Sequence, residues 1–287
     1  MVERRTYASH DGLHLVGDAF GDPAARPAIL LHGGGQTRHA WKETARRLAE
    51  NGWYALALDL RGHGESQWAA DENYSVDAFA SDFATVAQTF NALPVVIGAS
   101  LGGIAALIAC AESEDPLCAA LVLVDIAPRI ELGGVQRIVS FMGAHLDGFA
   151  TIEEAAQAIA AYSPNRPKPA DLTGLQKNLR RGADGRYFWH WDPRFLIGSR
   201  PPAASGDMDR LLRAARKVRV PTLLVRGKKS DMVSEVGVEE FLRAAPHAQF
   251  ADVSDAGHMV VGDRNEVFAG VILDFLQRGP EQPSTGG

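Results

Sequence analysis

Short apolar runs recur along the chain, and most are followed by a longer stretch with helical spacing. Continuous apolar runs of this length are typical of strands buried on both faces, as in a parallel sheet covered by helices. We expect such strands at 28–32, 54–60, 94–98, 119–125, 222–227 and 248–253. Helices are expected up to about residue 50, at 75–91, at 101–112, from about 234, and at 264–277. The alternation predicts an α/β fold with a mostly parallel central sheet and helices on both faces.

Two more strands are expected before these, at 4–9 and 14–20. They flank Asp11-Gly12, which favours a hairpin because glycine accepts a positive φ. Six strands are therefore expected before residue 127.

The alternation stops between residues 128 and 217. This region has helical stretches such as 152–161, a Pro-rich connector at 163–169 and an aromatic cluster at 187–195, but no strong strand run. A helical insertion of this size is normal for a subdomain. We expect the core to comprise 1–127 and 218–278, with a helical cap at 128–217 inserted after the sixth strand. The tail at 279–287 is expected to be disordered.

Composition narrows the class of protein. The chain has 287 residues, 46% of them hydrophobic, and a formal net charge of −6, which argues against disorder and against nucleic acid as a partner. No apolar run reaches the roughly 18 residues of a membrane span, and the N-terminus lacks the apolar segment of a signal peptide. We therefore expect a cytoplasmic protein without membrane association. Two cysteines are too few for a disulfide framework or a Cys-rich zinc site.

The segment Gly98-Ala99-Ser100-Leu101-Gly102 has the pattern G-x-S-x-G where an expected strand meets an expected helix. Glycines let the backbone crowd into a sharp turn that presents the serine hydroxyl. The helix N-terminus adds partial positive charge near a developing oxyanion. An ordinary Gly-rich turn with a solvent-facing serine is the alternative. The strand–turn–helix setting favours Ser100 as a nucleophile.

A serine nucleophile needs a base and a residue that orients the base. His258 lies in a polar loop after the last expected strand, and Asp231 lies in the loop after the strand at 222–227. Loops at the carboxyl ends of parallel strands meet at one edge of the sheet. We therefore expect Ser100, Asp231 and His258 to form a catalytic triad. Asp125 also ends a strand and is the rival acid, placed second to Asp231.

The Gly-rich segment 32–36 follows the strand at 28–32 and is the candidate oxyanion loop. A tetrahedral intermediate needs two fixed donors for its oxyanion. We expect these to be the N–H groups of Gly34 and Leu101. The Gln36 side chain could add a third donor, and a plain turn without a donor role is the alternative.

In this combination the sequence resembles the α/β-hydrolase superfamily. The matching pieces are His32-Gly-Gly-Gly35, Asp59-Leu-Arg-Gly-His-Gly-Glu-Ser66, Gly98-Ala-Ser-Leu-Gly-Gly103, Gly227…Asp231 and Gly257-His258, spanning about 28 to 275. The resemblance implies the α/β-hydrolase fold with a helical cap over the active site. Haloalkane dehalogenases and many epoxide hydrolases are similar in fold but have an aspartate at the position of Ser100. Ser100 therefore argues against both chemistries. Within the superfamily, the sequence most resembles small serine esterases, cofactor-free haloperoxidase-like members and carbon–carbon bond hydrolases.

The leading prediction is a serine hydrolase that cleaves a carboxylic ester or lactone of a small molecule, with no cofactor and no metal. Carbon–carbon bond hydrolysis and perhydrolysis would use the same triad and are the alternative enzyme activities. A ligand-binding receptor on this scaffold is the non-enzymatic alternative. The oligomeric state is left open.

Candidate substrate-binding residues are Gln36, Trp189, Met232 and Met259. The insertion's aromatic residues could line an apolar pocket or simply pack the insertion onto the core. The basic residues Lys177, Arg180, Arg181 and Arg186 favour a solvated face, with an anionic substrate group as the alternative.

Overall fold

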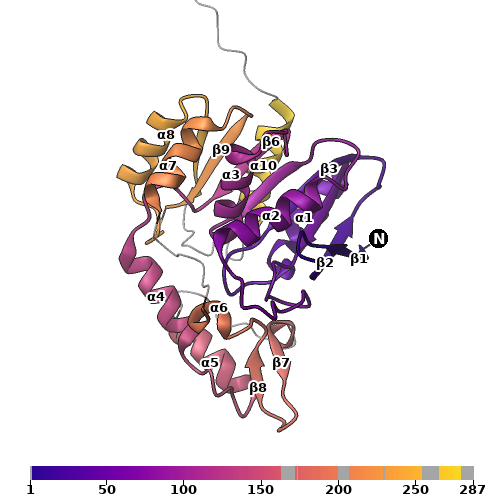
Figure 1. Ribbon diagram of the computed structural model, residues 1–287, viewed down its shortest axis with the longest axis vertical. Coiled ribbons are helices and arrows are strands. Elements are labelled where there is room, and N and C mark those ends of the chain that lie inside the picture. The colour runs from indigo at the N-terminus through magenta and orange to yellow at the C-terminus, as the bar shows by residue number, and fades with distance from the viewer. Residues whose placement is uncertain are drawn as a thin grey trace, which may run out of the picture.

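The computed structural model describes residues 2–162, 172, 174–199, 207–228, 230–253 and 265–278. An eight-stranded sheet forms its centre, and a group of shorter elements extends from one end (Figure 1). The strands are β1 (Val2–Ala8), β2 (His14–Phe20), β3 (Arg26–Leu31), β4 (Trp53–Leu58), β5 (Val95–Ala99), β6 (Ala120–Val124), β9 (Thr222–Gly227) and β10 (Gln249–Val253). The predicted α/β class with a mostly parallel sheet is confirmed.

The strand order places the carboxyl ends of six parallel strands at one edge of the sheet. The order is β1-β2-β4-β3-β5-β6-β9-β10. β1 and β2 form the expected antiparallel hairpin, where Gly12 has a φ of 85°, and β2 is antiparallel to β4. The remaining neighbours are parallel, so β4, β3, β5, β6, β9 and β10 end on the same side. Ligands of open α/β sheets bind at this edge.

Helices bury both faces of the sheet. The 3-10 helix η1 (Arg38–Trp41), α1 (Lys42–Glu50) and α10 (Asn265–Arg278) cover one face. The other face is covered by α2 (Val76–Ala87), α3 (Leu101–Glu112), α7 (Met208–Lys217) and α8 (Glu235–Ala244). In β3, Ile29 and Leu31 face the second set of helices, whereas Ala28 and Leu30 pack with Trp41. Strands covered on both sides have no polar face, which explains the continuous apolar runs of the sequence.

The second expected helix is shorter than the sequence predicts. Ser75 caps its start, because the hydroxyl oxygen accepts a hydrogen bond from the Ala78 N–H. α2 ends at Ala87 rather than at residue 91. The Thr89 hydroxyl donates to the Val86 carbonyl oxygen at 2.7 Å, and this local bond competes with continuation of the helix.

The region between β6 and β9 contains two short strands that the sequence does not predict. It contains α4 (Leu132–Gly143), α5 (Ile152–Tyr162), the 3-10 helix η2 (Leu175–Asn178), β7 (Leu179–Arg181), β8 (Tyr187–Trp189), α6 (Arg194–Ile197) and α7. β7 and β8 form an antiparallel hairpin, with Gly185 in the turn at a φ of 82°. Three-residue strands are too short to leave a clear pattern in the sequence. Within this region, α7 packs against α3 and α8, beside the sheet.

Two predicted segments, the connector at 163–169 and the tail at 279–287, lie outside the described residues. No helix in the described ranges combines the length and apolar character needed to cross a bilayer.

Candidate active site

Ser100 lies between β5 and α3 in a backbone conformation that serine rarely adopts, with φ 45° and ψ −115°. Such a conformation costs of order 1–3 kcal/mol and persists only where surrounding contacts hold it. The Ser100 N–H donates to the Val124 carbonyl oxygen at 3.0 Å, and the Ser100 carbonyl oxygen accepts from the Ile104 N–H at 2.9 Å. These bonds fix the turn on both sides and keep the half-buried side chain at the carboxyl edge of the sheet.

The two glycines that flank Ser100 are required by close backbone contacts. A Cβ atom at Gly98 would lie 2.6 Å from the Cα atom of Gly103. A Cβ atom at Gly102 would lie 2.6 Å from the Leu31 carbonyl oxygen. Both distances are below any normal contact, so the helix can begin this close to β3 and β5 only with glycine at these positions.

Asp125 has the same place on β6 that Ser100 has on β5. Ala99 of β5 pairs with Val124 of β6, so the residues that follow them lie next to each other in the register of the sheet. Asp125 also has a positive φ, 51°, and is 1% exposed. Its Oδ2 atom accepts a hydrogen bond from the Ser230 hydroxyl at 2.6 Å.

Asp231, the acid that the sequence analysis places first, is in a different environment. It follows β9 at the same edge, but its side chain is 38% exposed and forms an ion pair with Arg137 of α4. Ser230 connects the two loops, because its hydroxyl donates to Asp125 and accepts from the Met232 N–H at 3.1 Å. Of the two carboxylates, Asp125 is therefore the buried one beside the nucleophile.

His258 and Met259 lie outside the described residues. The base of the expected triad therefore stays a prediction.

The loop after β3 lies against the nucleophile. A Cβ atom at Gly33 would be 3.3 Å from the Cβ atom of Ser100. The Gly33 N–H donates to Gln36 Oε1 at 3.0 Å, and the Gly35 N–H donates to His63 Nε2 at 3.1 Å. Within the described ranges, the Gly34 N–H has no hydrogen-bond acceptor, and the Gln36 side-chain oxygen accepts from the Gly33 N–H.

At the other side of the nucleophile, the Leu101 N–H opens α3. It likewise has no acceptor among the described groups, as expected for the first turn of a helix. Neither N–H group, of Gly34 or of Leu101, is paired with a described acceptor, and their role as oxyanion donors stays a prediction.

Three buried histidines, His32, His63 and His190, hold this loop. His32 Nε2 accepts from the Leu60 N–H at 3.0 Å, which leaves Nδ1–H to donate to the Gly33 carbonyl oxygen at 2.8 Å. His190 Nδ1 accepts from the Gly64 N–H at 2.9 Å, so its Nε2–H donates to the Gly35 carbonyl oxygen at 3.2 Å. These tautomers follow from the partners of each ring.

All three imidazoles are neutral. Burial lowers the pKa of His32 to about 4. Burial, reinforced by the neighbouring His32, lowers the pKa of His63 to about 3. Burial also lowers the pKa of His190 well below its usual range. The ring centroids of His32 and His63 lie 5.3 Å apart, and those of His63 and His190 lie 5.9 Å apart. The histidines therefore form a row of neutral donors and acceptors behind the loop.

Ser100 opens into a cavity of about 620 Å³ that is mostly apolar. The same cavity is lined by Gly34, Gln36, Leu101, Trp189 and Met232, all named by the sequence analysis. Further apolar lining comes from the insertion and from the segment that leads into it: Ile130, Ile138, Phe141, Met142, Tyr162 and Phe195. Mainly apolar walls with a few polar groups are usual for small-molecule sites.

His190 and Asp192, whose side chains could form a metal pair or belong to a structural loop, have protein partners. Asp192 Oδ2 accepts from the Tyr74 hydroxyl at 2.6 Å and pairs with Arg194, while His190 holds the loop at Gly35. These contacts agree with the structural interpretation.

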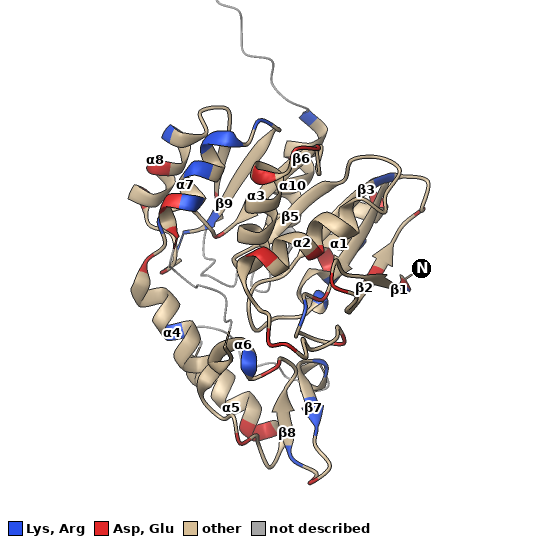
Figure 2. Cartoon of the chain, in the orientation of Figure 1, with Lys and Arg blue, Asp and Glu red and all other residues tan. Residues whose placement is uncertain are grey.

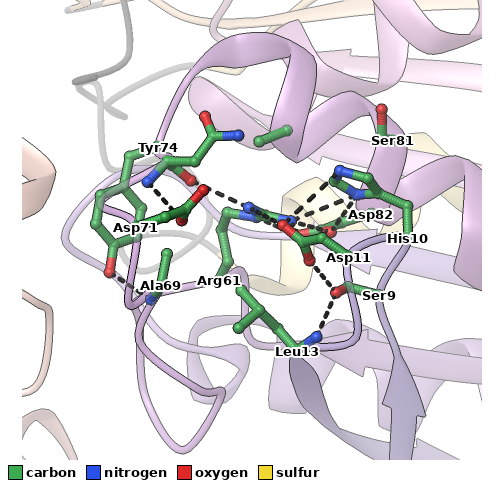
Figure 3. A network of polar contacts seen from close by, with 12 residues as sticks. Ser9, His10, Asp11, Leu13, Arg61, Ala69, Asp71, Tyr74, Ser81 and Asp82 are labelled. Atoms are coloured by element: carbon green, nitrogen blue, oxygen red, sulfur yellow. Dashed lines mark hydrogen bonds and ion pairs between the residues drawn. The ribbon is translucent and has the colours of Figure 1, made fainter. Parts of the chain in front are cut away.

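One group of described side chains, His10, Asp11 and Asp82, has the spacing of a metal site. Arg61 already occupies its centre (Figure 3). The guanidinium donates to Asp82 at 2.6 Å from both Nε and Nη2, and to Asp11 at 3.0 and 3.1 Å. Because arginine supplies the positive charge that a cation would bring, this group is an ion-pair network.

Comparison with known proteins agrees with this architecture. The model of the alpha/beta hydrolase family matches residues 28–271. The chain is 31% identical over 265 residues to esterase Rv0045c of Mycobacterium tuberculosis, covering 90% of this chain and 84% of that protein. It is 27% identical over 261 residues to the 3-hydroxybutyrate-oligomer hydrolase of Cupriavidus necator, covering 86% and 88%.

Among solved structures, that of E-2-(acetamidomethylene)succinate hydrolase superposes with a TM-score of 0.84 at 24% identity, covering 96% of this chain and all of that one. The family match takes in the loop after β3, the elbow at Ser100 and the ends of β6 and β9. On this evidence the chain belongs to the alpha/beta hydrolase family.

Proposed function

We propose that the protein hydrolyses carboxylic esters, lactones included, through an acyl-enzyme on Ser100. The observation that carries the proposal is the strained Ser100 turn, which opens into the apolar cavity with two N–H groups beside it. Two relatives that match most of the chain are an esterase and a 3-hydroxybutyrate-oligomer hydrolase. Both names fit ester cleavage.

The reaction proceeds in two acyl-transfer steps. His258 takes the Ser100 proton as the hydroxyl oxygen attacks the ester carbonyl carbon, and the N–H groups of Gly34 and Leu101 bind the oxyanion that forms. The oxyanion collapses, the carbon–oxygen bond of the ester breaks, and His258 returns the proton to the leaving alcohol. His258 then activates a water molecule, which releases the acid and restores Ser100.

The geometry favours Asp125 as the residue that orients His258. A triad carboxylate is normally buried and close to the nucleophile, so that it can hold the imidazole tautomer and stabilise the imidazolium. Asp125 is buried beside Ser100, whereas Asp231 is partly exposed and paired with Arg137. Asp231 remains the alternative acid.

Labelling with a fluorophosphonate probe, followed by peptide mapping, tests the nucleophile. We expect the label on Ser100 and its loss in His258→Ala. Ser100→Ala should lower ester turnover by about 10⁴-fold or more, because loss of a triad residue has effects of that size. Ser113→Ala, a change at an exposed serine at the end of α3, is the matched control. Wild-type turnover in Ser100→Ala would refute the proposal.

The acid is tested with Asp125→Asn and Asp231→Asn side by side. We expect kcat to fall by about 10³-fold or more in Asp125→Asn, because the wrong imidazole tautomer is then favoured. Asp231→Asn should change kcat by less than about tenfold. The opposite ranking, with both variants folded by circular dichroism, would assign the acid to Asp231.

A further inference from the structure

A second cavity, of about 860 Å³, adjoins the one that contains Ser100. The two share His39 and Lys177 as lining residues, so the cavities are adjacent at these side chains. We call the first the inner cavity and the second the outer cavity. The outer cavity lies where η2 and β7 of the insertion face the loop at residues 64–68.

The outer cavity is basic in a protein that is acidic. Its lining contains Arg4, Arg38, Lys177 and Arg180 against one carboxylate, Glu65. The whole chain has a formal net charge of −6. In Figure 2, basic residues mark β7 at the end of the molecule where the insertion lies. A cavity of one sign with low-dielectric walls concentrates ligands of the opposite sign.

Two of these cations are not neutralised by the described part of the chain. Arg38 and Arg4 both pair with Glu65, at 2.6 and 2.9 Å, and Arg38 also pairs with Asp18 and Asp59. Lys177 and Arg180, by contrast, have no carboxylate within ion-pair distance among the described residues. The Arg180 guanidinium lies 4.2 Å from the ring centroid of Trp68, which holds it in place through a cation–π contact.

The inner cavity continues this charge towards Ser100. Its described lining includes Lys42 and Lys177 and no aspartate or glutamate. η2, which carries Lys177, is joined to the loop after β3 by a hydrogen bond from the Thr37 hydroxyl to Asn178 Oδ1 at 3.3 Å. Lys177 is therefore held between the nucleophile's cavity and the basic outer one.

We propose that the enzyme acts on anionic esters, in which an apolar portion fills the inner cavity and a carboxylate or phosphate reaches Lys177 and Arg180. The proposal rests on the ester hydrolysis proposed above and specifies its substrate class. Lys177 contacts the anion at the junction of the two cavities, and Arg180 contacts it from the outer side. Both residues determine specificity and neither takes part in bond breaking.

Matched pairs of esters test this assignment. The first pair is 4-nitrophenyl hexanoate and the 4-nitrophenyl monoester of adipic acid, which differ by a terminal carboxylate. The second pair is the butanoate ester of propane-1,2-diol and that of glycerol 3-phosphate, which differ by a phosphate. The variants are Lys177→Gln and Arg180→Gln. Arg181→Gln is the control, because Arg181 is an exposed neighbour on β7 that lines neither cavity.

We expect wild-type kcat/KM to favour the anionic member of at least one pair, and the responding pair identifies carboxylate or phosphate as the group bound. Lys177→Gln and Arg180→Gln should each reduce the ratio of anionic to neutral kcat/KM by roughly threefold to fivefold, through KM of the anionic ester. Added salt should reduce this ratio as well.

Equal kcat/KM within both pairs would overturn the inference, as would a preference that Arg181→Gln reduces as much as Lys177→Gln does. In either result, Ser100-dependent turnover of the neutral esters would leave the ester hydrolase proposal intact. No turnover of any ester would instead contradict that proposal itself.

Discussion

The row of neutral histidines makes the stability of the fold depend on pH. His32 and His63 have pKa values of about 4 and about 3 in the folded protein, against an ordinary value of 6.5. Below pH 6.5 the unfolded chain therefore binds protons that the folded chain does not. The free energy of unfolding falls as the pH falls, and this loss continues until the folded-state pKa values are reached. The full contribution of both histidines is present above about pH 6.5.

The size of the effect follows from the same values. Each pH unit between the two pKa values corresponds to about 1.4 kcal/mol, so a drop from pH 6.5 to pH 5.0 costs about 2 kcal/mol for each histidine. The His63→Gln variant cannot titrate at this position. We expect its loss of stability between pH 7.5 and pH 5.0 to be smaller than that of the wild type by about 2 kcal/mol, even though the variant is less stable at neutral pH.

Urea unfolding at both pH values, followed by circular dichroism, measures this difference of differences. His14→Gln, at an exposed position on β2, is the control for replacing a histidine by glutamine. Other titrating groups cancel in the comparison because they are common to all three proteins. An unchanged pH dependence in His63→Gln would show that this imidazole is not buried and neutral, and the reasoning would fail.

Three further changes are expected to have measurable effects. Gly102→Ala should destabilise the fold by about 1–3 kcal/mol in urea titrations and reduce ester turnover, because the added Cβ meets the last carbonyl oxygen of β3. Asp82→Asn should cost about 3–5 kcal/mol, because it leaves the buried Arg61 charge without its closest partner; a loss below 1 kcal/mol would contradict the network in Figure 3. Oxidation with diamide should remove two thiols together, because the Sγ atoms of Cys110 and Cys118 lie 3.0 Å apart, whereas Cys118→Ala should keep its single thiol under the same treatment.

The sequence predicted the parts of this fold that depend on local pattern. Strands such as β9 and the helix after Ser100 were predicted to the residue, because buried runs and the elbow glycines are local signals. The hairpin of β7 and β8 was not predicted, because a three-residue strand has too few positions to show alternation. The early end of α2 was also missed, because it depends on one hydroxyl, that of Thr89.

Within the site, the sequence does not reveal contacts between residues that lie far apart along the chain. Asp125 and Asp231 both follow strands, and the sequence alone does not separate them; their burial and partners differ only in the folded chain. The role of His63 and His190 depends on Gly35, which is far from both in sequence. No local pattern marks a histidine that binds a distant backbone group. The position of His258 stays a prediction.

The backbone groups of Gly35 connect the core to the insertion. His63, from the loop after β4, accepts its N–H, and His190, from the insertion, donates to its carbonyl oxygen. A movement of the insertion that widens the way into the inner cavity would stretch the second of these bonds. The loop that presents the Gly34 N–H would then keep one other hydrogen bond to the insertion, from the Thr37 hydroxyl to Asn178 Oδ1. The position of the Gly34 N–H therefore depends on how the insertion is seated on the core, through the imidazole of His190 and the amide of Asn178.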